Sequence, residues 1–253
     1  MITVVCWKWR RADGSDLFRA EHVNRLRAGL ERHLHLEHRL VCVTDDPEGL
    51  DRRVWVEPLP GGLRNTPRCR RRMQIFSRDF AAGLGARILS IDLDVVLVGD
   101  ITPLVDRREP LVCWRVGYAQ VFSGSFHLMA AGHLDGLWRA YESDPEGYPR
   151  RVSAEKVPSD QAMMNAYLDG SPRYPYKPGQ HPVPCWTEAD GFVTYFGQGY
   201  ERLEHLGVGP RRTTLPDGAR VVVLGSADLA ELECGRDPWM REHWTSLDAE
   251  VPA

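Results

Sequence analysis

The chain has 253 residues, which is within the range of larger single α/β domains and is enough to bury a sizeable core. Its 32 lysines and arginines are matched by 35 aspartates and glutamates, so the overall charge gives no reason to expect nucleic acid or an anionic membrane as a partner. No apolar run approaches the roughly 18 residues that a membrane span requires, and the chain begins with a strand-like run instead of a secretion signal. We therefore expect one domain over residues 1–253, without a transmembrane segment.

The apolar residues recur with two alternating periods along the chain, one typical of strands and the other of amphipathic helices. The expected strands are 2–6, 40–43, 54–56, 88–91, 111–114, 125–129 and 221–224. The expected helices are 21–34, 69–80, 133–142 and 160–168. Because strands and helices alternate, the pattern predicts an α/β fold with a mostly parallel central sheet.

Two segments, 143–158 and 170–191, are rich in proline, glycine and charge. They are interpreted as excursions from the core and not as linkers between domains. We expect them to shape the side of the protein that receives an acceptor.

Six cysteines are scattered singly, without the close pairs of a zinc site or the dense spacing of disulfide-stabilised secreted domains. They are Cys6, Cys42, Cys69, Cys113, Cys185 and Cys234. This distribution favours a reduced, cytoplasmic protein.

Two carboxylates, Asp92 and Asp94, follow an apolar strand in the segment RILSIDLDVVLVGDITPL. Charge in such surroundings is costly unless it is paired or bound to a cation. On an extended backbone both side chains would point to one side and would share a hard metal ion through oxygen. The alternative is that one aspartate caps a turn while the other is solvated, but the apolar residues on both sides favour the metal site.

The ordered set of motifs along the chain resembles bacterial glycosyltransferases of the GT-A fold, close to family 8. The segments that carry the resemblance are VVCWKW, TDDPEGL, CRRRMQIF, SIDLDVVLVGDITPL, SGSFHLM, SDQAMMN, WTEADG and DPWMREHW. It implies a Rossmann-like nucleotide-diphospho-sugar transferase domain over most of the chain. The D-x-D alone is a weak signal, whereas the ordered set is fairly specific.

The resemblance implies that Asp92 and Asp94, with Leu93 between them, bind Mn²⁺ or Mg²⁺ together with a diphosphate. It also implies that Arg72 reaches the phosphates. On a helical wheel Arg72 flanks the buried face that contains Phe76, whereas Arg71 points the other way. The alternative for these arginines is a solvated basic helix face.

Asp160 and Gln161 match a family Asp-Gln pair that contacts hydroxyls of the donor sugar. Two polar side chains after Ser159 also make an ordinary helix N-terminus. Either role fits these two residues.

The first loops of the family hold the nucleoside. This places Trp7, Lys8 and Trp9 after the first strand, and Asp45 and Asp46 after the second, near a nucleotide. A uracil ring would stack on Trp7, although a tryptophan at this position is more often part of the core.

The chain departs from the family after the late strand, where Leu224-Gly225 replaces the His-Gly that supplies a third metal ligand. Either the site works with two aspartates, phosphate and water, or catalysis has been lost, or a nearby acid substitutes. The candidate substitutes are Asp228, Glu231 and Glu233. Near the C-terminus, Pro238-Trp239 matches a family Pro-Trp pair, and Arg236 stands in for a phosphate-contacting lysine.

The expected function is metal-dependent transfer of a hexose from a nucleotide diphosphate sugar, expected to be a UDP-sugar, to an acceptor hydroxyl on a glycan, a lipid-linked glycan or a small molecule. One alternative is a sugar-nucleotide-binding protein without catalysis, suggested by Leu224. Another is a haloacid dehalogenase-like phosphatase with Asp92 as its nucleophile, because IDLDVVL is similar to the first motif of those enzymes. That motif usually opens the chain, and no late aspartate pair accompanies it here.

Overall fold

The structure is a computed structural model. It describes residues 1–11, 15, 17–63, 66–116, 121–153, 158–169, 183–195, 214–225 and 229–246.

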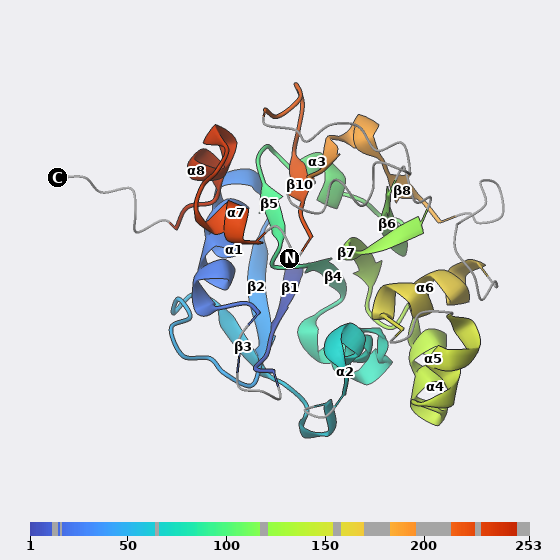
Figure 1. The fold of residues 1–253 in the computed structure, drawn as a ribbon. Helices are drawn as coiled ribbons and strands as arrows, with labels where there is room; N and C mark the ends of the chain where they lie inside the picture. Colours follow the sequence, from blue (N-terminus) through green and yellow to red (C-terminus); the bar gives the residue numbers. More distant parts are fainter. Residues whose placement is uncertain are drawn as a thin grey trace.

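A seven-stranded sheet forms the centre of the fold, with strand order β3-β2-β1-β4-β7-β6-β8 (Figure 1). Its strands are β1 (Ile2–Lys8), β2 (His38–Thr44), β3 (Trp55–Pro58), β4 (Arg87–Ile91), β6 (Leu111–Val116), β7 (Val121–Ala130) and β8 (Cys185–Trp186). The pairings of β4 and β6 with β7 are antiparallel and the others are parallel. The predicted α/β class with a mostly parallel sheet is therefore confirmed, with β7 as the reversed strand.

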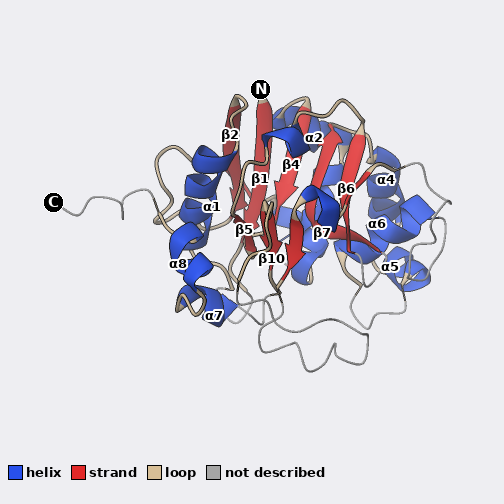
Figure 2. Cartoon of the chain, turned by 90° about the horizontal axis from the view of Figure 1, so that it is seen from above, coloured by secondary structure: helices blue, strands red, loops and turns tan. Residues whose placement is uncertain are grey.

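Helices cover both faces of this sheet (Figure 2). They are α1 (Ala20–His33), α2 (Arg78–Leu84), α3 (Thr102–Val105), α4 (Asp135–Ser143), α5 (Gly147–Val152), α6 (Asp160–Asp169), α7 (Leu229–Glu233) and α8 (Pro238–His243). Short 3-10 segments are η1 (Gly61–Leu63), η2 (Arg68–Phe76) and η3 (Glu188–Asp190).

The central strand β1 shows why both faces need helices, since every residue from Thr3 to Lys8 is buried. Val4 and Cys6 pack toward α1 on one face, and Val5 and Trp7 pack toward η2, α2, α4 and α6 on the other. Such a continuous apolar run is typical of a strand that is covered on both sides.

A second, three-stranded sheet has the order β5-β10-β9, formed by β5 (Val95–Leu97), β10 (Val221–Val223) and β9 (Phe192–Thr194). β5 runs antiparallel to β10, which joins the segment after Asp94 to the C-terminal part of the chain. A third apolar cluster, which includes Val96, Leu224 and Trp239, packs α7 and α8 against this sheet. In Figure 1 these two helices lie next to α1.

The single helix expected over residues 69–80 is wrong. The 3-10 segment η2 ends at Phe76, Ser77 is extended with φ −61° and ψ 129°, and α2 starts at Arg78. The Ser77 hydroxyl accepts a hydrogen bond from the Phe80 amide at 3.5 Å. Serine at an N-cap satisfies a free amide of the first turn, which favours a new helix here over continuation of the old one.

The two expected excursions contain more structure than predicted. The first includes α5, and the second returns to the central sheet through β8, which pairs with β6. Residues 154–157 and 170–182 lie outside the described residues. None of the described helices is long and apolar enough to cross a membrane.

Candidate functional site

Three parallel strands bring the predicted site residues to one edge of the central sheet. β1 ends at Lys8, β2 at Thr44 and β4 at Ile91, and all three run in the same direction. The loops that begin with Trp9, Asp45 and Asp92 therefore start at the same edge. In open α/β sheets ligands bind outside the carboxyl ends of the strands.

The two aspartates of the D-x-D do not lie on an extended strand. An extended backbone is therefore not what would turn both side chains to one side. Residues 93 and 94 form a turn, and the Val95 amide donates to the Asp92 carbonyl at 3.3 Å. Leu93 nevertheless packs into the core while Asp92 and Asp94 remain partly exposed. The turn thus presents both carboxylates at the edge with Leu93 as its anchor.

Arg72 lies between two of the aspartates. Its Nη1 contacts Oδ1 of Asp92, while its Nη2 donates to Oδ1 of Asp160 at 3.0 Å and its Nε lies 2.8 Å from Oδ2 of the same carboxylate. Burial alone would lower the pKa of Arg72, but Asp160 and, to a smaller extent, Asp94 raise it above its usual value. The guanidinium therefore stays charged beside three carboxylates.

The charges of this cluster do not balance. Within the described part of the chain, the carboxylates of Asp92 and Asp160 both contact the guanidinium of Arg72, so these three side chains carry one negative charge in excess. Asp94 lies close enough to help raise the pKa of Arg72. Among the described residues no group of three or more histidine, cysteine, aspartate or glutamate side chains is arranged to hold a metal ion. Two carboxylates together with phosphate oxygens and water are nevertheless an ordinary donor set for Mg²⁺. The cluster therefore fits a divalent cation that binds together with a phosphorylated ligand.

A buried histidine lies under the cluster. His127 on β7 is opposite Ser90 of β4, is 3 % exposed, and its ring centroid is 5.9 Å from that of Phe76. Burial and the nearby charge of Arg72 lower the pKa of His127 to about 4, against smaller opposing effects of Asp160 and the Gly124 backbone. At neutral pH this ring is uncharged and adds no positive charge to the cluster.

The start of α6 is tied to β7 by side-chain hydrogen bonds to the backbone. Gln161 Oε1 accepts from the Gly124 amide at 2.8 Å. Asn165 accepts from the Phe122 amide at 2.8 Å and donates to the Phe122 carbonyl at 2.7 Å. The helix also has the expected cap, since the Ser159 hydroxyl accepts from the Ala162 amide at 3.0 Å. These contacts fix the place of Asp160, and the sugar contact expected of Asp160 and Gln161 stays a prediction.

Gly124 packs against the same cluster. A Cβ atom at this position would lie 3.3 Å from Cβ of Gln161, 3.5 Å from Nη2 of Arg72 and 3.7 Å from Oδ2 of Asp160. A glycine inside a strand often marks such a close approach.

The solvated basic face considered for the arginines of η2 is wrong. Arg70 and Arg71 are 7 % and 6 % exposed. Arg70 Nη1 donates to the Pro145 carbonyl at 3.2 Å, and Arg71 Nε donates to the Leu63 carbonyl at 3.0 Å. In 3-10 geometry successive residues turn by about 120°, so the α-helical wheel does not apply to this segment.

The neighbouring loops contain a second charged cluster. Lys8 is 2 % exposed, and its Nζ lies 2.8 Å from the Asp46 carbonyl oxygen and 2.9 Å from Asp46 Oδ2. Arg10 Nε lies 3.2 Å from the same carboxylate, and the Arg10 amide donates to Asp45 Oδ1 at 3.1 Å. The hydrogen bond from Lys8 is the largest effect that lowers the pKa of Asp46. Here Asp46 has two cationic partners, which come from the end of β1 and the loop after it.

The tryptophans expected near a nucleotide lie in different surroundings. Trp7 is 4 % exposed and packs in the core, 6.1 Å from the Phe80 ring, as the alternative interpretation of this residue holds. Trp9 is partly exposed, and the guanidinium carbon of Arg71 lies 5.2 Å from its ring centroid. Trp239 is 5 % exposed and packs against Tyr195.

Position 224, where the family resemblance leads to the expectation of a third metal ligand, does lie beside the D-x-D. The Leu224 amide donates to the Asp94 carbonyl at 3.0 Å, which extends the pairing of β10 with β5. Its side chain is buried in the third apolar cluster, and Gly225 follows at the surface.

Glu233, one of the three acids considered as substitute ligands, lies near the start of α1. Its Oε1 is 2.8 Å from Nη2 of Arg19 and 3.1 Å from Nε2 of His22. It belongs to another group of charges, so this candidate is wrong. Asp228 and the side chain of Glu231 lie outside the described residues. Arg236, expected to contact phosphate, is exposed.

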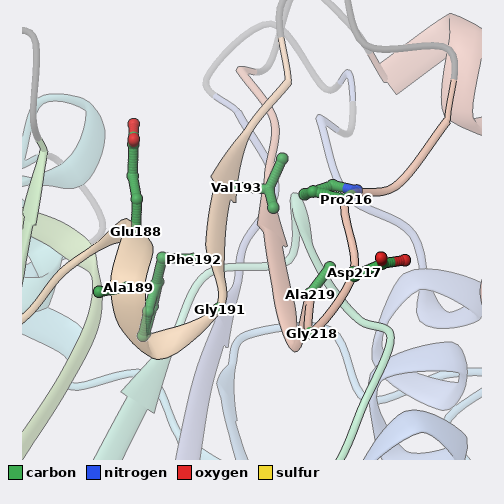
Figure 3. Close-up of a pocket in the computed structure, with 9 residues that line it drawn as sticks. All are labelled: Glu188, Ala189, Gly191, Phe192, Val193, Pro216, Asp217, Gly218 and Ala219. Atoms are coloured by element: carbon green, nitrogen blue, oxygen red, sulfur yellow. The ribbon is translucent and has the colours of Figure 1, made fainter.

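A hollow of about 220 Å³ lies at the opposite end of the three-stranded sheet, between η3–β9 and the loop before β10 (Figure 3). The residues that line it are Glu188, Ala189, Gly191, Phe192, Val193, Pro216, Asp217, Gly218 and Ala219. In Figure 3 the carboxylates of Glu188 and Asp217 extend away from each other. This lining does not bring reactive groups together, so the D-x-D edge is the stronger candidate.

Sequence reasoning missed three residues of this edge: Gly124, His127 and Asn165. Glycine within the strand-like SGSFHLM was the available signal for the first. The other two carry no signal of their own. Comparison with known proteins adds no assignment, since no protein-family model matches the chain and no curated protein is significantly similar to it.

Proposed function

We propose that the D-x-D edge binds a nucleotide diphosphate sugar, a UDP-sugar in the first instance, together with Mn²⁺ or Mg²⁺. We further propose that the protein transfers the hexose to an acceptor hydroxyl. The observation that carries this proposal is that Asp92 and Asp160 share the guanidinium of Arg72 at the carboxyl edge of the sheet, which leaves negative charge in excess among these three described side chains. A divalent cation would balance that excess, and a diphosphate would then bind without repulsion.

In this proposal Asp92 and Asp94 hold the cation. When bound, such a cation stabilises the negative charge that develops on a departing diphosphate. Arg72 contributes a fixed guanidinium within the same cluster, where partial burial strengthens its attraction for an anion. Gln161, at the start of α6, is the side chain expected to reach a sugar hydroxyl, because only its carbonyl oxygen is used by Gly124. The acceptor class, a reduced cytoplasmic setting and the single domain remain predictions from the sequence.

Leu224 favours a second candidate, a protein that binds the sugar nucleotide without transferring the sugar. The position beside Asp94 holds a side chain that cannot bind a metal ion. A cation held by only two carboxylates binds weakly until a diphosphate adds its oxygens. The two candidates therefore predict the same nucleotide binding and differ only in turnover.

The phosphatase alternative has little support beyond the motif itself. Its nucleophile, Asp92, contacts the guanidinium of Arg72 and would have to leave that contact to attack. The late aspartate pair that accompanies the motif in those enzymes does not accompany it in this sequence.

The deciding experiment is titration calorimetry of UDP with and without Mn²⁺, on the wild type and on the double variant Asp92→Asn, Asp94→Asn. We expect binding that needs Mn²⁺ and is lost in the double variant. Asp79→Asn, which removes an exposed carboxylate on α2, should bind like the wild type. Absent or Mn²⁺-independent binding of UDP by the wild type contradicts the proposal. Release of UDP from UDP-glucose or UDP-galactose then separates the transferase from the binding protein.

A further inference from the structure

The carboxylates around Arg72 do not hold it equally. Asp160 contacts two nitrogens of the guanidinium, Nη2 at 3.0 Å and Nε at 2.8 Å, one with each carboxylate oxygen. Asp92 contacts only Nη1. Of these two nitrogens only Nη2 donates a hydrogen bond to Asp160, and Nε adds a second ion-pair contact to the other carboxylate oxygen.

The two aspartates also differ in access. The Asp160 side chain is 6 % exposed and the Asp92 side chain is 19 % exposed. An ion or phosphate that arrives from solvent therefore reaches Asp92 and not Asp160. The low exposure of Asp160, together with its contacts to Arg72, leaves little room for a sugar hydroxyl to reach this carboxylate.

The hydrogen bonds that hold the backbone around Asp160 and Asp92 also differ. Asp160 begins α6, whose first turns are joined to the β7 backbone through Gln161 and Asn165. Asp92 begins a turn, where its backbone makes two hydrogen bonds, from its amide to the Ser125 carbonyl at 2.9 Å and from the Val95 amide to its own carbonyl at 3.3 Å. Arg72 therefore has one rigid partner and one that is open to exchange.

We infer that Asp160 is a positioning residue which keeps Arg72 in place, while Asp92 exchanges its contact with Arg72 for the divalent cation. Nη1 of Arg72, released from Asp92, then becomes a donor to the diphosphate. The inference takes its cation from the proposed function and is otherwise independent of it. It assigns Asp160 to the orientation of Arg72 and not to contact with the sugar.

Double-mutant cycles of thermal unfolding test this exchange without any assay of activity. The single variants are Arg72→Gln, Asp92→Asn and Asp160→Asn, and each aspartate variant is also combined with Arg72→Gln. The Tm of every variant is measured once with a chelator and once with saturating Mn²⁺. We expect the Arg72–Asp160 pair to be non-additive in Tm in both conditions, on the order of 2–4 °C or more. The Arg72–Asp92 pair should be non-additive only without Mn²⁺.

The exposed pair of Arg150 on α5 and Glu146, the residue before that helix, is 3.6 Å apart; it is the control and should be additive in both conditions. Non-additivity of Arg72 and Asp92 that survives Mn²⁺ overturns the exchange. Two other results overturn it as well: additivity of Arg72 and Asp160 once Mn²⁺ is added, and a wild-type Tm that Mn²⁺ does not change.

The Mn²⁺ affinity of the single variants gives a second measure if a double variant unfolds too early to be melted. Removal of the competing guanidinium in Arg72→Gln should tighten Mn²⁺ binding roughly tenfold, and Asp160→Asn, which leaves Arg72 to Asp92 alone, should weaken it. Unchanged affinity in Arg72→Gln contradicts the inference. If Mn²⁺ abolishes the Arg72–Asp92 coupling but UDP does not bind, the inference stands and the proposed glycosyltransferase function is wrong. If UDP binds only with Mn²⁺ but the Arg72–Asp92 coupling persists, the proposed function stands and the inference is wrong.

Discussion

Two charged clusters lie at the same edge of the central sheet and differ in their balance. At the ends of β1 and β2, Asp46 is paired with two cations, Lys8 and Arg10, and Asp45 accepts a hydrogen bond from the Arg10 amide. At the end of β4, Asp92 shares the guanidinium of Arg72 with Asp160, the first residue of α6. The first cluster therefore holds the ends of β1 and β2 together, whereas the second has one carboxylate more than it has guanidinium groups among the described residues, and the proposed function assigns that excess to a ligand. Stored electrostatic cost of this kind is common at functional sites.

The largest expected effect concerns pH and the histidine under the unbalanced cluster. The folded protein holds the pKa of His127 at about 4, whereas an unfolded histidine titrates near 6.5. Between these values the unfolded chain binds a proton that the folded one does not. Stability present above pH 6.5 should therefore be lost as the pH falls toward 4, by up to about 3 kcal/mol.

Urea unfolding at pH 7 and pH 4.5 measures this loss, and His127→Gln should reduce it. The exposed His133→Gln is the matched control and should keep the wild-type pH dependence. The balanced cluster has another window, because the pKa of Asp46 is lowered from 3.8 and its contribution disappears only at lower pH. A wild type with equal stability at the two pH values would contradict the buried, neutral state of His127.

The next effect breaks the balanced cluster. Lys8→Met removes the ammonium that meets both the carbonyl and the carboxylate of Asp46, while Arg10 remains as a partner. We expect a loss of about 2 kcal/mol in the free energy of unfolding, measured with urea. The Mn²⁺ response at Asp92 should be unchanged. A variant that keeps its stability but loses the Mn²⁺ response would assign Lys8 to the binding site.

The smallest effect compares one neutralised aspartate in each cluster. Asp46→Asn should destabilise the protein by about 1 kcal/mol, since it loses the charge that meets Lys8 and Arg10. Asp92→Asn should stay within about 0.5 kcal/mol of the wild type or gain stability, because it relieves the excess of negative charge. Thermal melts of both variants in chelator give the comparison. Equal losses would mean that the two clusters do not differ in the way proposed.

Local patterns predicted much of this architecture. The strand and helix periods placed β1, α1, β2 and β4 within a few residues, and the position of Asp92 at the end of β4 followed from them. Parallel neighbours then brought the loops after β1 and β2 to the same edge. These features depend on residues that are close in the chain, and for this reason a single sequence is enough to predict them.

The predictions that were wrong mostly concern contacts between residues that are farther apart in the chain. Ser77 divides the expected helix 69–80, and the burial of Arg70 and Arg71 depends on the Pro145 and Leu63 carbonyls. The pair of Arg72 and Asp160 joins residues 88 positions apart. Such contacts are set by tertiary packing, and neither propensity nor spacing indicates them.

The pairing of β5 with β10 has a consequence for the order in which the protein is made. Residues 221–224 leave the ribosome long after the D-x-D, yet they supply the strand that completes the sheet next to Asp94. A nascent chain that ends before Val221 can form β1, β2 and β4 but lacks this neighbour. Since pairing over so long a separation carries a large closure entropy, the ligand-binding edge is expected to mature late in folding, after most of the central sheet.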